Sequence, residues 1–242
     1  MSRIETPKPI AGYQSWRHLV FLHWRVPSKM LREQLPNGLE PETFDGSSWL
    51  ALVPFAMERV RPWWAPPLPG ISWFLETNVR TYVRHESGVT GVWFFSLDAN
   101  SRLAVRTART FWNLNYLSSR MTLKTGPSSN VFKYTGRRRM FPESVYDLGV
   151  ELTGTEYRAA NEGSLEQFLL ERYTLVTQSA GGRFLTAEVA HRPYEFVPVN
   201  ILHCRETYLS EVCRHSDDYG PPDHAVYSPG VDVRVSRLEP IE

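Results

Sequence analysis

Residues 75–84 read LETNVRTYVR, and two kinds of side chain alternate strictly along them. One set comprises Leu75, Thr77, Val79, Thr81 and Val83. The other set comprises Glu76, Asn78, Arg80, Tyr82 and Arg84. Because side chains alternate between the two faces of a strand, whereas a helix would spread both sets around its axis, the segment predicts a β-strand. A chain with such a strand needs neighbouring strands to pair with it.

Other segments supply those neighbours. Residues 15–26 predict a strand with Trp16, His18, Val20, Leu22 and Trp24 on one face. The segment from Trp49 to about Val60 is apolar on both faces, as expected of a barrel wall covered by helices. Further strands are expected near 91–98, 130–136, 148–158, 173–178, 183–190 and 231–238.

Short helices are expected at 28–35, at 101–112, after Ser164 and at 206–214. No repeat or linker divides the chain, so residues 1–242 are expected to form one domain. The fold class is therefore predicted to be α+β and mainly β, built as a barrel or strongly curved antiparallel sheet with a few short helices. A loop follows Arg61 and is rich in Pro and Trp; it could form a pocket rim or pack over one end of the core.

Targeting features are few. The N-terminus MSRIETPKPI lacks the apolar segment of a secretory signal, and no apolar run is long enough to span a membrane. Two cysteines, Cys204 and Cys213, are too few to staple a secreted chain of this length. These observations predict a cytoplasmic protein that has no membrane partner.

The charge distribution is uneven, although the net charge is only +1. No acidic residue occurs between Asp98 and Glu143. That interval contains the basic residues Arg102, Arg106, Arg109, Arg120, Lys124, Lys133, Arg137, Arg138 and Arg139. Such asymmetry indicates either an anionic partner or a solvated face that pairs with carboxylates elsewhere in the fold.

Three of these arginines belong to the helix expected at 101–112. Arg102, Arg106 and Arg109 are spaced i, i+4 and i+7, which places them on one helical face. They could clamp a carboxylate or phosphate, or they could pair with Glu76 and Asp98 in a structural network. The spacing does not choose between these two uses.

Glu76 is the first candidate for acid–base chemistry, and it shares a strand face with Arg80. A carboxyl group confined in a barrel lumen can have a shifted pKa and can transfer protons. If the same face points outward, it is merely solvated. Neither metal-ligand spacing nor a nucleotide-binding glycine pattern occurs, so neither a metal site nor a cofactor is expected.

Long stretches of the sequence resemble the YqjF-like family, domain of unknown function 2071. They include HWRVPSKMLREQLPNGLEPETFDGSSWLALVPFAMERVRP, GVWFFSLDANSRLAVRTAR, EQFLLERYTL and YSPGVDVRV. The resemblance covers most of the chain and implies no established activity. That family is in turn distantly similar to acetoacetate decarboxylases, which implies a β-barrel or cone around a small polar pocket.

The similarity to acetoacetate decarboxylases is incomplete where their chemistry occurs. Glu76 matches their aromatic-x-Glu element, and Arg109 lies where their Gly-Arg-Glu would be. Their Pro-Lys-Lys falls on Asn115, Tyr116 and Leu117, so both lysines are missing. A Schiff base needs a primary amine, which excludes the usual decarboxylase mechanism.

Two hypotheses follow. In the first, a barrel pocket binds a small organic anion through Arg80, Arg102, Arg106 and Arg109, and any catalysis is acid–base, with Glu76 as acid or base and Tyr116 as a proton donor. In the second, a non-catalytic binding protein uses the basic segment 102–139 to meet an acidic partner. Nucleic acid is the less favoured partner, because no recognition motif is present.

Overall fold

The computed structural model describes residues 9–106, 114–126, 130–212 and 219–241. The fold is mainly β, with short helices, as predicted. The first half contains β1 (Ile10–Val26), α1 (Ser28–Arg32), β2 (Leu39–Pro41), β3 (Ser48–Pro62), β4 (Phe74–His85), β5 (Thr90–Ala99) and β6 (Tyr116–Thr125). The second half contains β7 (Val131–Arg138), β8 (Val145–Leu152), α3 (Leu165–Leu170), β9 (Thr174–Gln178), β10 (Phe184–Ala190), β11 (Val197–Glu206), α4 (Tyr208–Val212), β12 (His224–Ser236) and β13 (Glu239–Pro240). Residues 102–106 are also helical.

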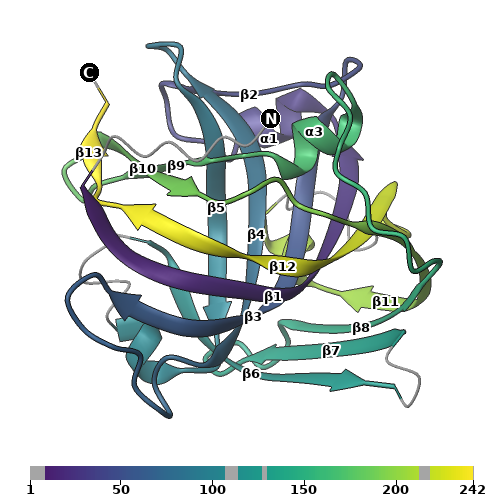
Figure 1. The fold of residues 1–242 in the computed structure, drawn as a ribbon. Coiled ribbons are helices and arrows are strands. Elements are labelled where there is room, and N and C mark those ends of the chain that lie inside the picture. The colour runs from purple at the N-terminus through teal and green to yellow at the C-terminus, as the bar shows by residue number, and fades with distance from the viewer. Residues whose placement is uncertain (1–8, 107–113, 127–129, 213–218, 242) are drawn as a thin grey trace.

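The strands close into two rings that share one wall (Figure 1). The nine-strand ring runs β4, β5, β6, β7, β8, β11, β12, β1 and β3 and returns to β4. The smaller ring runs β12, β1, β3, β4, β5, β9 and β10 and returns to β12. The wall common to both rings is therefore β12, β1, β3, β4 and β5. Almost all neighbours are antiparallel, but β5 pairs in parallel with both β6 and β9.

Each face of the shared wall packs into a separate core. From β1, Leu19 and Phe21 point into the core of the smaller ring, and Val20 and Leu22 point into that of the nine-strand ring. This arrangement explains why the 49–60 segment is apolar on both faces. The expected covering of helices was wrong: a second ring of strands covers the wall instead.

The predicted face of β1 also needs correction, because Trp16 belongs to the core of the smaller ring, whereas Val20 and Trp24 belong to the other. His18 has a φ of 54°, and the register with β3 shifts between Arg17 and Leu22. This bulge reverses the side-chain alternation. Opposite it stands Gly230, at φ 123°, where a Cβ atom would lie 1.9 Å from the Trp16 carbonyl oxygen.

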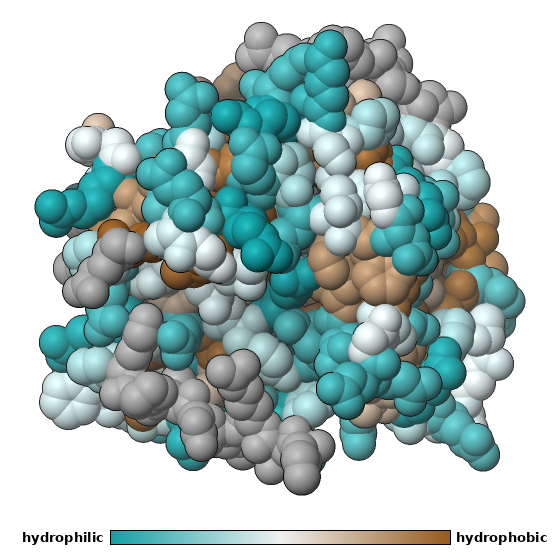
Figure 2. Space-filling model, turned by 90° about the horizontal axis from the view of Figure 1, so that it is seen from above, coloured by the Kyte–Doolittle hydropathy of each residue, from teal (hydrophilic) through white to brown (hydrophobic). Residues whose placement is uncertain are grey.

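Turn and cap chemistry agrees with the sequence in several places. Ser164 caps α3 by accepting a hydrogen bond from the Gln167 N–H at 3.2 Å. Ser101 accepts one from the Ala104 N–H at 3.3 Å at the start of the 102–106 helix. The end of the molecule seen from above is largely hydrophilic, with hydrophobic side chains gathered in limited areas (Figure 2). None of the helices formed by the described residues is long and apolar enough to cross a membrane.

Candidate functional site

The smaller ring encloses a cavity of about 220 Å³. Every strand of that ring contributes to the wall, and most of the lining is apolar. The strands provide Trp16, Met57, Glu76, Arg80, Phe94, Leu175, Val189 and Val235, among others. The polar groups in this wall are few, which is the usual composition of a small-molecule site.

Glu76 and Tyr116 form a buried hydrogen-bonded pair in the cavity wall. Glu76 lies on β4, and Tyr116 is the first residue of β6. The Tyr116 hydroxyl donates to Glu76 Oε2 at 2.7 Å, and only 4% of Glu76 is exposed. Burial raises the pKa of Glu76 to about 7, against the lowering effect of the Tyr116 hydrogen bond; the charge of Asp98 raises it further. Both protonation states of Glu76 are therefore populated near neutral pH.

Arg80 lies four residues beyond Glu76 on the same face of β4, about 13 Å along the strand. Its side chain is buried, with 9% exposed, against the rings of Phe21 and Tyr82. Nη2 donates to the Leu169 carbonyl oxygen at 3.3 Å, and Nε has no hydrogen-bond partner. No carboxylate among the described residues forms an ion pair with it.

The cavity wall contains a second arginine, Arg172, which lies on the short connection between α3 and β9. Unlike Arg80, it is paired with a carboxylate. Its Nη1 donates to Glu42 Oε2 at 2.6 Å, and its Nε donates to the Phe168 carbonyl oxygen at 2.6 Å. No sequence signal linked it to Glu76, since nearly a hundred residues separate the two positions. Arg172 is thus paired with a carboxylate, whereas Arg80 is the cation in the described part of the cavity wall whose charge no carboxylate balances.

Asp98 lies on the other face of the shared wall, where it is completely buried. Arg138 donates to its two carboxylate oxygens from Nε and Nη2, each at 3.0 Å, and the Ser119 hydroxyl donates at 2.6 Å. Arg138 also pairs with Glu211 on α4. Arg138, one of the nine basic residues between Asp98 and Glu143, is therefore a buried structural cation that pairs with carboxylates from elsewhere in the fold.

The arginines of the 102–106 helix are not brought together with Glu76. Arg102 and Arg106 are exposed, whereas Leu103 and Ala104 face the hollows beside the helix. Arg109 lies outside the described residues. Arg80 is thus the one proposed anion-binding residue that the described structure places in the cavity wall.

The mouth of the cavity opens toward a second hollow of about 730 Å³. The two share Gln14, Val60, Phe74, Ala104 and Val235 as lining residues. The Trp-rich loop forms part of its rim through Trp64 and Ile71. Trp63 and Trp64 are 55% and 71% exposed, so of the two alternatives for this loop the structure agrees with a pocket rim and not with packing over the core.

Four other basic residues of the 120–139 interval form cross-strand pairs on β6 and β7. Arg120 stands opposite Arg137, and Lys124 stands opposite Lys133. All four are exposed, and none lines the cavity or the hollow at its mouth. Three or more potential metal ligands do not come together anywhere in the described part of the chain.

Residues 13–232 match the family of uncharacterized conserved proteins called domain of unknown function 2071. The uncharacterized protein YqjF of Bacillus subtilis (strain 168) is 34% identical over 181 residues, which cover 75% of this chain and 73% of YqjF.

Solved structures show the same fold at low sequence identity. An acetoacetate decarboxylase-like enzyme from Sphingomonas wittichii RW1 has a TM-score of 0.66 at 14% identity, covering 100% of this chain and 99% of that one. The acetoacetate decarboxylase of Legionella pneumophila gives 0.63 at 10% identity, covering 100% and 92%. The enduracididine biosynthesis enzyme MppR complexed with pyruvate gives 0.64 at 11% identity, covering 98% and 93%.

Proposed function

Because this chain belongs to the domain of unknown function 2071 family and has the fold of acetoacetate decarboxylases, we propose that it binds a small organic acid in the cavity of the smaller ring. One observation carries the proposal: the Arg80 guanidinium is buried in the cavity wall and has no acidic partner among the described residues. A buried cation that lacks a counter-charge is costly, and a bound carboxylate would supply the charge and accept the free Nε hydrogen bond.

The size of the cavity limits the ligand. A volume of about 220 Å³ is smaller than the roughly 300–1,000 Å³ of drug-sized ligand sites, so it suits an acid of a few carbon atoms. Two structural neighbours carry names or ligands of this class, acetoacetate and pyruvate. A 2-oxo or 3-oxo carboxylic acid is the class we propose here.

Glu76 and Tyr116 give the proposed site its acid–base capacity. With its carboxyl group titrating near neutral pH, Glu76 can accept a proton from a carbon next to a carbonyl and later return it. Burial raises the pKa of Tyr116, and the adjacent Glu76 charge raises it further, so the phenol keeps its proton. Tyr116 therefore acts as a hydrogen-bond donor that steadies the carboxylate form.

Arg80→Met tests the anion site. We expect pyruvate or acetoacetate to raise the melting temperature of the wild-type protein, with a gain of about 2.7 kcal/mol at one hundred times Kd. Arg80→Met should weaken binding about tenfold or more, because a charge-assisted hydrogen bond contributes about 1.5–3 kcal/mol. Thermal shift as a function of ligand concentration measures both quantities.

Two controls separate the cavity from general charge effects. Arg84→Met removes the exposed arginine four residues further along β4, and Arg102→Met removes an exposed one on the short helix. Neither should change the ligand-induced shift. Acetone, which lacks the carboxylate, should give no shift. Equal losses in Arg80→Met and Arg84→Met would contradict the proposal.

We also expect no imine with the ligand. The described lysines, Lys29, Lys124 and Lys133, are exposed, and none lines the cavity. Treatment with acetoacetate and borohydride, followed by mass spectrometry of the intact protein, should leave the mass unchanged. A stoichiometric adduct would show that an amine reaches the bound ketone and would require a different mechanism.

A further inference from the structure

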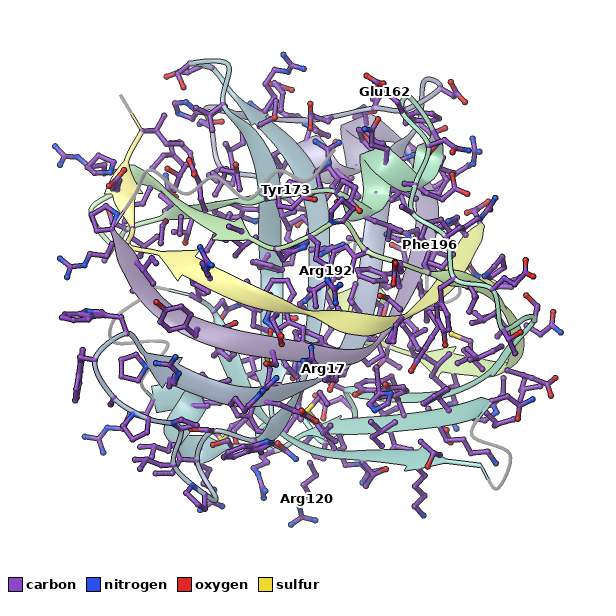
Figure 3. The ribbon with its side chains drawn as sticks, in the orientation of Figure 1. Arg17, Arg120, Glu162, Tyr173, Arg192 and Phe196 are labelled. Atoms are coloured by element: carbon purple, nitrogen blue, oxygen red, sulfur yellow. The ribbon has the colours of Figure 1, made fainter. Side chains whose placement is uncertain are left out.

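A third hollow, with a different chemistry, lies on the outer surface of the smaller ring, where β1, β3 and β12 run side by side. Its volume is about 510 Å³. The side chains Arg59, Arg61, Arg192 and Arg234 line it, together with one carboxylate, Asp232. We call this hollow the arginine groove. Arg192, which lines the groove, and Arg17, which donates a hydrogen bond to Asp232, lie on the face that β1 and β12 cross (Figure 3).

The strand register brings these arginines together from distant parts of the sequence. Tyr13 on β1 stands opposite Arg61 on one neighbouring strand and Arg234 on the other. The Cα atoms of Arg61 and Arg234 are thus about 10 Å apart, two strand spacings, with Tyr13 between them. The Arg61 guanidinium lies 4.3 Å above the Tyr13 ring. Arg192 follows β10, whose Ala190 pairs with Arg234.

The one carboxylate of the groove is already satisfied. Asp232 accepts hydrogen bonds from Ser15 at 2.7 Å, Arg17 at 2.5 Å and Arg59 at 3.2 Å. The hydrogen bonds from Ser15 and Arg17 and the charges of Arg17 and Arg59 lower its pKa, so it stays ionised. Its single negative charge already faces two arginines, Arg17 and Arg59, and it forms no ion pair with Arg192 or Arg234 in the described structure.

Arg192 and Arg234 are exposed, and no hydrogen bond or ion pair is formed by either side chain within the described structure. The backbone at Arg192 is nevertheless held in place, because the buried His191 ring bonds to the Arg192 carbonyl oxygen through Nδ1 at 2.7 Å. Like charges gathered in a hollow repel one another unless an anion lies between them.

We infer that the arginine groove binds a compact anion that carries several phosphate groups, such as a polyphosphate or a phosphate ester. Guanidinium groups match phosphate oxygens with paired N–H donors, and several of them converge on one hollow. The groove has a volume of about 510 Å³, which suits a small ligand, and its lining residues come from short stretches of neighbouring strands. This site is separate from the cavity that contains Arg80, and it does not depend on the function proposed for that cavity.

The test measures binding of inorganic tripolyphosphate by calorimetry at an ionic strength of about 0.15 M, where the Debye length is about 8 Å. Arg192→Met/Arg234→Met should weaken binding about tenfold or more, since it removes two charge-assisted donors. The matched control is Arg120→Met/Arg137→Met, which removes two exposed charges from β6 and β7, on the part of the surface where Arg120 projects away from the strands (Figure 3). The control should change the dissociation constant less than about twofold, because exposed charges farther apart than a Debye length are largely screened.

Three further results decide the inference. Arg80→Met should keep full tripolyphosphate affinity, and acetate at the same ionic strength should not compete. Equal weakening by the two double variants would overturn the inference, because it would show diffuse attraction rather than a site. Much tighter binding of a long single-stranded oligonucleotide than of tripolyphosphate would also overturn it, because the ligand would not then be compact.

Discussion

Asp98→Ala should destabilise the fold by about 3–5 kcal/mol, the largest effect of a single substitution that we expect. The substitution leaves Arg138 buried between β5 and α4 without the carboxylate that accepts both of its 3.0 Å hydrogen bonds. Ser119 would lose its acceptor as well. Urea denaturation at pH 7 measures the difference in the free energy of unfolding, with one common value for the dependence of that free energy on urea concentration.

An exposed ion pair provides the matched control. Glu166→Ala breaks the 3.5 Å pair with Arg158, whose side chain is largely exposed, and should cost at most about 1 kcal/mol. The double variant Asp98→Ala/Arg138→Leu should lose less than the sum of the two single variants, because the interaction between the two side chains is then lost once rather than counted twice. If Asp98→Ala lowers the free energy of unfolding no more than Glu166→Ala does, the Asp98–Arg138 pair does not stabilise the shared wall.

The sequence predicted strands best where one face differs from the other. The alternation at 75–84 placed Glu76 and Arg80 on one face of β4, and the structure has them both in the cavity wall. Two long strands, β6 and β11, were missed, and so were the short strands β2 and β13. Much of β6 and β11 is exposed, and each alternates over only part of its length, residues 119–124 in β6 and 197–202 in β11, which is shorter than the alternation of β4. Strand pairing, which depends on distant segments, decides their conformation.

Contacts between distant segments also explain what the sequence left open in the candidate site. Nine basic residues without an acid nearby in sequence indicated either an anionic partner or a solvated face that pairs with carboxylates elsewhere. One of them, Arg138, does pair with Asp98 forty positions away, but it is buried. The arginine groove gathers Arg59, Arg61, Arg192 and Arg234 from three separate segments, none of which is unusually basic. Charge along the chain does not reveal such a cluster, because register across β1, β3 and β12 creates it.

Glu76→Gln should remove a pH dependence of stability worth about 3 kcal/mol. Burial raises the pKa of Glu76 from an ordinary 4.5 to about 7, so the folded protein binds a proton that the unfolded chain has lost between these values. The stability contributed by the protonated form is complete below pH 4.5 and is lost as the pH rises through 7. Each unit of pKa shift corresponds to about 1.4 kcal/mol.

The measured quantity is the difference in unfolding free energy between Glu76→Gln and the wild-type protein, followed from pH 4 to pH 9. Because every other titrating group is common to the two proteins, the difference isolates Glu76. It should rise in favour of the variant by about 3 kcal/mol between pH 4.5 and pH 8, since Gln accepts the Tyr116 hydrogen bond without ionising. Glu33→Gln changes an exposed carboxyl group on the surface and should give a nearly flat difference. A flat profile for Glu76→Gln as well would mean that Glu76 titrates as an ordinary carboxyl group. The cavity would then lack the neutral-pH acid–base pair on which the proposed proton transfer rests.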